Sequence, residues 1–450
     1  MKTRRHFLTS TAAITAGTWI APRFAIGQSG PSANEKINLA FIGCGGRGWD
    51  NLNALGGENI VALCDIDDQR AGGAFEKFPN AKRFKDYREM LDKMGKEIDA
   101  VVVSTPDHSH FPATMAAMEL GKHVFTEKPL AHNIWQCRTL KKGAKHHGVV
   151  SQMGNQGHAT EGIRFIREWY EAGALGNVTE VLAWFTGPDF NGPFFKKPDA
   201  FPPTAQPVPD HIDWNLWQGP HVGKVDYNPV LHPLTWRGFF DFGCAELGDW
   251  ACHTLDAPFW ALQLGMPTAV EAEKRDGGSE IFTPDSSLIR FEFPARGDKP
   301  PVTLKWHDGN IRPDIRPEWG LKELGADGMI MVGDKASLMT GGRPDSPRLI
   351  PEDLWMEFRK NIPEKTIPRV GRGGHYKEWT DAIRGVGPVP GSNFDYAADL
   401  TEMSLLGVLA MRFGGRIEYD ASSMKITNRP ELNAYLKEPV REGWVYGENL

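Results

Sequence analysis

Residues 37–48 read Ile37-Asn38-Leu39-Ala40-Phe41-Ile42-Gly43-Cys44-Gly45-Gly46-Arg47-Gly48, and this stretch decides the fold. A short apolar run, typical of a buried strand, leads straight into G-x-G-x-x-G and then into a helix-compatible segment from Trp49 to Leu55. In that order the first glycine permits a tight turn, the second lets the backbone approach a pyrophosphate, and the third lets the helix pack on the strand. The sequence therefore predicts a dinucleotide-binding loop at the start of a helix.

A second apolar run, Ile60 to Cys64, ends in Asp65, which lies 22 positions after Gly43. A carboxylate at this spacing is placed to accept hydrogen bonds from the adenosine ribose and to repel a 2′-phosphate, so NAD is the expected cofactor. Arg70 would admit NADP if it turned toward the ribose, and a solvated helix residue is its alternative role. As a helix N-cap alone, Asp65 would carry no such meaning.

Further apolar strands follow at Asp99–Val103, Lys122–Thr126 and Val149–Met153, with helices expected between them. This alternation predicts a parallel sheet whose ligands bind at the carboxyl ends of the strands. A metal site is not expected at His108 and His110, because no clustered cysteine or carboxylate accompanies them. The residues expected to contact the cofactor are Gly43, Gly45, Gly46, Arg47, Gly48, Asp65, Ser104, Thr105, Asp107, His110, Glu127, Lys128 and Asn155.

Three of these motifs together resemble the Gfo/Idh/MocA oxidoreductases, including the glucose-fructose oxidoreductase and inositol dehydrogenase members. They are the glycine loop, Thr105-Pro106-Asp107-His108-Ser109-His110, and Glu127-Lys128-Pro129-Leu130. The resemblance implies an α/β fold: a Rossmann domain at 36–155 and an α/β domain at 156–450. In such proteins the second domain has an open, mostly antiparallel sheet that forms the substrate floor and often the oligomer interface, so a homo-oligomer is expected.

The second half carries one strong constellation, residues 243–256, in which Asp249 and His253 stand four apart and would share a helix face. Such a pair is usually a surface or capping feature. The resemblance adds that the family keeps an Asp and a His at this spacing opposite the Lys of the Glu-Lys-Pro motif, which makes Lys128, Asp249 and His253 the expected catalytic set. Histidine suits the base that removes a hydroxyl proton, and lysine suits a developing negative oxygen.

A loop-rich insertion at 186–236 is dense in Pro, Phe and Trp. Its tryptophans, Trp214 and Trp217 among them, fit either sugar stacking or a satellite hydrophobic cluster. Trp236 and Arg237 immediately precede the catalytic segment and are expected, with Lys128, Asp249 and His253, to bind the substrate. His375 is left open between the site and a helix cap.

The N-terminus resembles a twin-arginine export signal: Arg4-Arg5 precedes a modest apolar run and small residues near 25–27. A signal at 1–27, a linker at 28–35 and a periplasmic protein without a membrane anchor are expected. The net charge of −6 gives no basic footprint for nucleic acid. Five cysteines form no dense framework, and the spacing leaves a Cys244–Cys252 disulfide open.

Together these features predict an oxidoreductase that acts on a sugar, cyclitol or glycoside hydroxyl. Free dinucleotide is expected to be scarce outside the cytoplasm, so an exported enzyme should hold its NAD tightly. An NAD-dependent glycoside hydrolase or lyase that oxidises the sugar transiently is the second hypothesis. A carbohydrate-binding protein without catalysis is the third, and the retained catalytic set argues against it.

Overall fold

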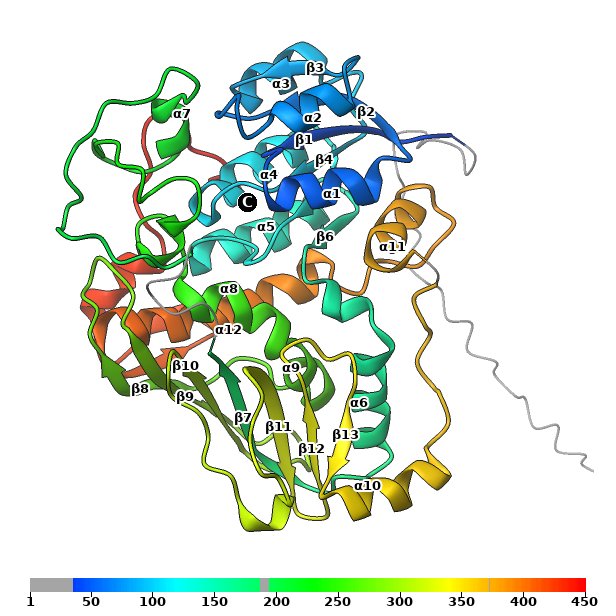
Figure 1. The fold of residues 1–450 in the computed structure, drawn as a ribbon. Helices are drawn as coiled ribbons and strands as arrows, with labels where there is room; N and C mark the ends of the chain where they lie inside the picture. Colours follow the sequence, from blue (N-terminus) through cyan, green and yellow to red (C-terminus); the bar gives the residue numbers. More distant parts are fainter. Residues whose placement is uncertain (1–34, 187–193, 372) are drawn as a thin grey trace, which may run out of the picture.

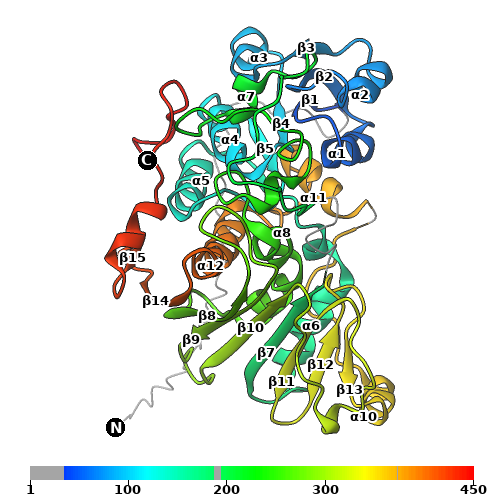
Figure 2. The same ribbon diagram turned by 60° about the vertical axis from the view of Figure 1, so that its left-hand side comes forward.

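The computed structural model describes residues 35–186, 194–371 and 373–450. The expected export signal and its linker, except for Glu35, lie outside the described residues. The described chain forms two stacked α/β bodies with α8 (Ala245–Thr254) and α12 (Phe394–Phe413) between their sheets (Figures 1 and 2). No helix in the described part of the chain is long and apolar enough to cross a membrane.

The first body is a six-stranded, wholly parallel sheet in the order β3-β2-β1-β4-β5-β6. This order reverses direction between β1 and β4, which creates the crevice where such sheets bind ligands. The Rossmann prediction is confirmed. The strands are β1 Asn38–Ile42, β2 Asn59–Cys64, β3 Lys82–Phe84, β4 Ala100–Val103, β5 His123–Thr126 and β6 Ser151–Met153. The helices are α1 Arg47–Leu55, α2 Gly72–Lys77, α3 Tyr87–Met94, α4 His110–Glu119 and α5 Ile134–His146.

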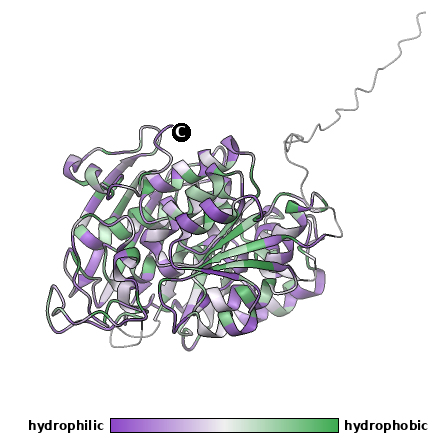
Figure 3. Ribbon diagram, turned by 90° about the horizontal axis from the view of Figure 1, so that it is seen from above, coloured by the Kyte–Doolittle hydropathy of each residue, from purple (hydrophilic) through white to green (hydrophobic). Residues whose placement is uncertain are grey.

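The central strands form because they are apolar throughout and covered on both faces. All four residues of β4 are buried, as the uninterrupted Ala-Val-Val-Val run predicts. Seen from above, these strands carry the hydrophobic colour and the surrounding helices show hydrophilic outer residues (Figure 3). The short edge strand β3 was missed from sequence, because Lys82 and Arg83 are exposed and give it no apolar pattern.

The second body is a nine-stranded open sheet in the order β13-β12-β11-β7-β10-β9-β8-β14-β15. Only the β7–β10 pair is parallel, so the expected mostly antiparallel sheet is confirmed. Its strands are β7 Val178–Phe185, β8 Ala269–Asp276, β9 Ser286–Phe293, β10 Val302–Asp308, β11 Asp327–Gly333, β12 Ser337–Thr340, β13 Arg348–Ile350, β14 Gly415–Asp420 and β15 Lys425–Ile426. Helices α6 Glu161–Glu171, α9 Asp256–Leu262 and α10 Glu352–Phe358 accompany it.

A continuous core joins the two bodies. One hydrophobic cluster runs from Val101 on β4 through Leu406 on α12 to Phe291 on β9. A second lies on the other face of the Rossmann sheet and is completed by α11 (Gly374–Ile383), whose Trp379 and Ile383 are fully or almost fully buried there. The chain thus returns, more than 200 residues later, to cover its own first domain.

The aromatic insertion folds over the carboxyl edge of the Rossmann sheet (Figure 1). It contains α7 (Trp214–Gln218), where the rings of Trp214 and Trp217 stack with centroids 4.2 Å apart. Both belong to a buried satellite cluster that also holds Trp236 and Phe282. The satellite-cluster interpretation therefore describes most of this segment. All five cysteines are buried and unpaired, so Cys244 and Cys252 form no disulfide in this structure.

Candidate active site

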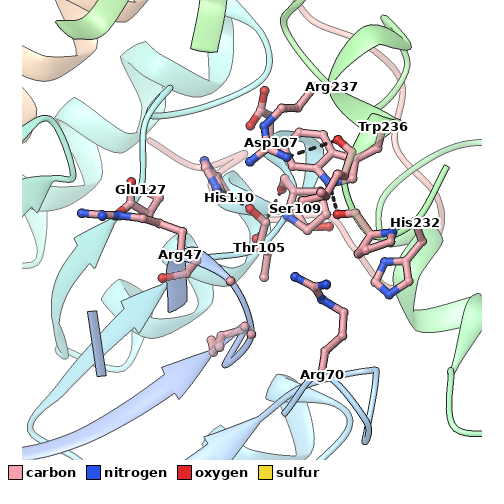
Figure 4. Close-up of a pocket in the computed structure, with 18 of the residues that line it drawn as sticks. Arg47, Arg70, Thr105, Asp107, Ser109, His110, Glu127, His232, Trp236 and Arg237 are labelled. Carbon is pink, nitrogen blue, oxygen red and sulfur yellow. Dashed lines mark hydrogen bonds and ion pairs between the residues drawn. The ribbon is translucent and has the colours of Figure 1, made fainter. Parts of the chain in front are cut away.

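A cavity of about 510 Å³ lies at the carboxyl ends of the Rossmann strands and reaches α8 of the second body. The cavity, here called the cleft, is lined by nearly all the side chains predicted from sequence (Figure 4). Those predicted residues are Gly43, Gly45, Gly46, Arg47, Asp65, Ser104, Thr105, Asp107, His110, Glu127, Lys128, Trp236, Arg237, Asp249 and His253. Gly48 and Asn155 are the two predicted residues that do not line it.

The glycine loop is shaped so that side chains cannot replace its first and third glycines. Gly43 has φ +84°, and a Cβ there would lie 2.5 Å from the carbonyl oxygen of Ser104. A Cβ on Gly48 would lie 2.0 Å from the carbonyl oxygen of Gly43, which is the close helix–strand contact expected of the third glycine. Gly48 therefore acts beneath the cleft.

Asp65 stands at the end of β2 with its carboxylate already oriented. The backbone N–H groups of Cys44 and Asp67 donate to its two oxygens at 2.7 and 3.0 Å. Burial raises the pKa of Asp65, and these two bonds oppose that rise. Arg70 points into the cavity from the same side (Figure 4), so it is a cleft residue and the solvated-helix alternative does not describe it.

Lys128, at the end of β5, reaches across to the second body. Its Nζ donates to Asp249 Oδ1 at 2.7 Å and to the Asp249 carbonyl oxygen at 2.9 Å. The Nε of Arg237 lies 3.4 Å from the same Oδ1. Burial raises the pKa of Asp249, but the charges of Lys128 and Arg237 outweigh it and hold the pKa at about 2. Asp249 is therefore a carboxylate that fixes two cations at working pH.

His253 lies one turn beyond Asp249 on α8, and both line the cleft, as the four-residue spacing predicts. Its ring is 2 % exposed, and its Nδ1 is buried with no hydrogen-bond partner among the described residues. Burial, together with the charges of Lys128 and Arg343, lowers the pKa of His253 well below its usual value. The side chain is consequently a neutral imidazole with an unused polar atom beside the cleft.

Other predicted residues support these groups. The ring nitrogens of His110 lie 2.7 Å from the Pro129 carbonyl oxygen and 2.9 Å from that of Thr105, which ties the Lys128 turn to the β4 turn. Asp107 accepts the backbone N–H of Cys244 at 3.1 Å, and burial raises its pKa. Glu127 accepts from Arg47 and Asn51, both at 3.0 Å.

Three histidine or amide side chains considered from sequence lie elsewhere. Asn155 is fully buried, donates to Asp256 at 3.0 Å and accepts from Ser392, so its amide is engaged away from the cleft. His108 bonds the carbonyl oxygens of Trp217 and Phe242 and joins the insertion to the first body. His375 lies under β6, 2.7 Å from the Met153 carbonyl oxygen.

Several cleft residues escaped sequence reasoning. They are Trp250, which lies inside the 243–256 constellation, and four residues from distant segments that sit in no motif: Phe185, His232, Arg343 and Trp444. Trp250 is the one with a usable signal, because it adjoins Asp249. The others reach the cleft only through the tertiary fold.

A Rossmann crevice whose Lys128 meets Asp249 and His253 of a second α/β body defines a two-domain, dinucleotide-binding protein. The chain belongs to the Gfo/Idh/MocA oxidoreductase family. A model described as "Oxidoreductase family, NAD-binding Rossmann fold" matches residues 37–155, and one described as "Oxidoreductase family, C-terminal alpha/beta domain" matches residues 162–277. Together they match just over half of the chain, and NAD is the cofactor of the first domain.

Curated relatives are similar over part of their length. Glycosyl hydrolase family 109 protein 1 of Shewanella sp. (strain MR-4) is 33% identical over 166 residues, 30% of this chain and 36% of the relative. Inositol 2-dehydrogenase of Salmonella typhimurium (strain LT2) is 27% identical over 198 residues, 42% of this chain and 57% of the relative. The matched regions thus span about a third to somewhat over half of these relatives.

Solved structures share the fold across most of the chain. The WlbA dehydrogenase from Chromobacterium violaceum, in complex with NADH and UDP-GlcNAcA, has a TM-score of 0.61 at 17% identity and covers 88% of this chain and 99% of its own. Levoglucosan dehydrogenase, in complex with NADH and L-sorbose, has a TM-score of 0.58 at 16% identity and covers 85% and 99%.

Proposed function

We propose that the protein transfers a hydride between a secondary hydroxyl of a sugar, cyclitol or glycoside and a nicotinamide cofactor that stays bound between turnovers. The observation that carries this proposal is the convergence of Lys128, Asp249 and His253 at one end of a cleft that begins at the glycine loop. Relatives named inositol 2-dehydrogenase and levoglucosan dehydrogenase support a polyol or sugar substrate.

The residues present fit a nicotinamide dinucleotide. Gly43 and Gly45 carry no side chains of their own, as close approach of a pyrophosphate requires, the Arg70 guanidinium lies beside the loop, and Arg47 begins the helix behind it. Asp65 is placed for the adenosine ribose and favours NAD over NADP by repelling a 2′-phosphate. When bound, the cofactor supplies the acceptor or donor of the hydride.

The side chains of this chain would divide the remaining work. The Lys128 ammonium donates a hydrogen bond to the reacting oxygen and stabilises the negative charge that develops on it. Asp249 holds that ammonium in place at 2.7 Å. The neutral imidazole of His253 accepts the hydroxyl proton, for which a lowered pKa keeps it in the unprotonated form. Trp236 and Arg237 form the rim on the substrate side.

Location and assembly belong to the same proposal. The Arg4-Arg5 segment supports export of the folded protein to the periplasm. Free dinucleotide is expected to be scarce there, so an enzyme that released its reduced cofactor after one turnover would find no NAD to replace it. We therefore expect a redox-balanced cycle on retained cofactor. A homo-oligomer, dimer or tetramer, formed through the open sheet is also proposed from the family resemblance.

A redox-neutral glycoside hydrolase or lyase cycle is the second candidate. The observation that favours it is the 33% identity over 163 residues to the α-N-acetylgalactosaminidase of Shewanella oneidensis, which covers 30% of this chain and 35% of the relative. In that cycle the cofactor would supply the hydride acceptor and His253 would accept the hydroxyl proton. The glycosidic substituent would then leave together with the proton on the carbon beside the new carbonyl, water would add, and the same hydride would return.

Protein purified with its own cofactor tests both candidates. Denaturation should release about one equivalent of dinucleotide, and a panel of sugars, inositols and chromogenic glycosides should then be added to the holoprotein. A lasting rise in reduced-nicotinamide absorbance supports net oxidation, whereas aglycone release without that rise supports the hydrolase cycle. Neither signal with any panel member, or a protein without dinucleotide, contradicts the proposal.

A further inference from the structure

One cationic side chain at the substrate end of the cleft has no carboxylate partner among the described residues. Six cationic side chains line the cleft, and four of them contact three carboxylates: Arg47 contacts Glu127 at 3.0 Å, Lys85 contacts Asp68 at 3.0 Å, and Lys128 and Arg237 share Asp249 at 2.7 and 3.4 Å. The other two, Arg70 and Arg343, make no ion pair with any residue in the described ranges.

Arg70 is accounted for by the dinucleotide. Its guanidinium lies against the glycine loop, with Nη2 3.0 Å from where a Cβ on Gly46 would stand and Nε 3.3 Å from one on Gly45. That is the place where the family's cofactor carries its phosphates. The positive charge of Arg70 would therefore be compensated by the phosphates of the cofactor.

Arg343 lies at the opposite end, beside the proposed catalytic set. Its charge is among the causes that lower the pKa of His253, and its Cζ is 5.1 Å from the ring centroid of Trp250. Trp250 is itself held by a stack on Phe185, with centroids 3.9 Å apart. The guanidinium thus rests on an immobilised aromatic face at the cleft.

The backbone on both sides of Arg343 is anchored although its side chain is exposed. The Gly342 carbonyl oxygen accepts the hydroxyl of Thr254, the residue after His253, at 3.0 Å, and the Gly342 N–H donates to Asp327 at 2.6 Å. On the other side, the Pro344 carbonyl oxygen accepts from Thr160 at 3.3 Å. A fixed backbone and an unpaired guanidinium are the arrangement of an anion receptor.

We propose that Arg343 binds an anionic substituent of the substrate, so that the protein acts on acidic sugars or glycosides, with a carboxylate such as that of a hexuronate as the bound group. This inference rests on the proposed function, because it assigns the substrate class of the same cleft. A guanidinium matches a carboxylate with two parallel hydrogen bonds, a geometry that an ammonium cannot reproduce. Neutral sugars would leave the Arg343 charge uncompensated beside Lys128 and Arg237.

The test compares matched substrates on the holoprotein, with an excess of a ketose as hydride acceptor so that the retained cofactor is reoxidised in each cycle: methyl glucuronide, methyl glucoside and methyl glucoside 6-sulfate. We expect the wild-type kcat/KM to favour the acidic sugar about tenfold or more, the worth of one well-formed ion pair. Arg343→Gln should reduce that ratio at least tenfold, mainly through KM, and Arg343→Lys should restore only part of it. Arg348→Gln is the matched control, because Arg348 lies five residues on and pairs with Glu352 outside the cleft at 3.0 Å.

The outcomes separate the Arg343 assignment from the proposed oxidoreductase function. A wild-type preference for the neutral sugar, or an unchanged ratio in Arg343→Gln, overturns the Arg343 assignment while turnover still supports the proposed function. A preference for the 6-sulfate over the uronide retains the anion site and changes the bound group to a sulfate. If no sugar turns over, thermal shift with glucuronate against glucose still reads the site, and an Arg343-dependent shift supports it although the oxidoreductase proposal has failed.

Discussion

His253 is the residue on which the proposed chemistry depends most directly. Replacing it with alanine removes the proton acceptor without touching the glycine loop, so kcat should fall by about 10²–10⁴-fold while bound dinucleotide stays near the wild-type level. Single-turnover absorbance and dinucleotide released on denaturation measure the two quantities. His146→Ala, on the exposed end of α5, is the control. Unchanged turnover in His253→Ala would remove the residue from the mechanism.

The pH dependence of turnover follows from the charges around His253. Burial and the charges of Lys128, Arg343 and Arg47 lower its pKa, and the charge of Asp249 opposes them. A base must be unprotonated, so activity should persist as pH falls through 6.5 and decline roughly tenfold per unit only below the lowered pKa. A kcat/KM profile from pH 4 to 8 checks this. An acid limb at or above 6.5 would contradict the environment described for His253.

For individual residues, the sequence identified the candidate catalytic side chains but not the residues that surround them. Lys128 and the Asp249–His253 pair were singled out through the family resemblance, because the four-residue spacing alone is usually a surface or capping feature, and the structure brings all three to one cleft. Arg343 stands in a Gly-Gly-Arg-Pro loop without a motif, and only tertiary contacts carry it to His253. Asn155 was expected at the cofactor, but its partners Asp256 and Ser392 come from remote segments that no local pattern reveals.

Among the elements, the aromatic insertion is held to the first body through Asp67, just after β2. Asp67 lies with its two oxygens 3.0 Å from His211 Nδ1 and 2.9 Å from His232 Nε2, and the N–H of Asp68 donates to the His211 carbonyl oxygen. Because His232 and Trp217 of the insertion line the cleft, this junction fixes part of the cleft wall.

Asp67→Asn should loosen this junction. An amide cannot accept from both imidazoles through two oxygens, and a buried polar group left unpaired costs about 1–3 kcal/mol. We expect bound cofactor to dissociate about tenfold faster or more, measured by chase with excess dinucleotide, and proteolysis within 194–236 to accelerate. Asp226→Asn, in the same insertion but paired only with exposed Lys224, is the control. Equal dissociation rates in both variants would contradict a retaining role for the junction.

Element prediction succeeded where hydrophobic periodicity was strong and failed where tertiary contact decides. β1, β2, β4 and β5 match their apolar runs to within a residue or two because burial on both faces demands an unbroken run. β3 escaped because an exposed edge strand has no such demand. In the insertion, composition favoured core packing and kept sugar stacking as the alternative, and the Trp214–Trp217 stack inside a buried cluster agrees with packing.

Across the whole molecule, α11 is the element that ties the second half of the chain to the first. The Trp379 ring is fully buried, with its centroid 5.7 Å from that of Phe125 on β5. Trp379→Ala should lower the free energy of unfolding by about 3–5 kcal/mol and Trp379→Phe by less, because the first leaves a large cavity. Denaturant unfolding measures the free energy of unfolding of both variants, and the dinucleotide that each variant retains on purification shows whether its first domain is intact. A loss below 1 kcal/mol in the alanine variant would show that α11 is dispensable to that core.

The position of α11 also sets an order of events during synthesis. The strands and glycine loop leave the ribosome early, yet one face of their sheet, which α1 and α2 cover in part, is completed only when residues 374–383 have followed. A growing chain that stalls before that point would expose apolar residues of this sheet face to chaperones, and its nucleotide-binding domain would be incompletely folded. We therefore expect the cofactor to bind late in synthesis, and a chain truncated before residue 374 to be recognised and degraded as an incomplete protein.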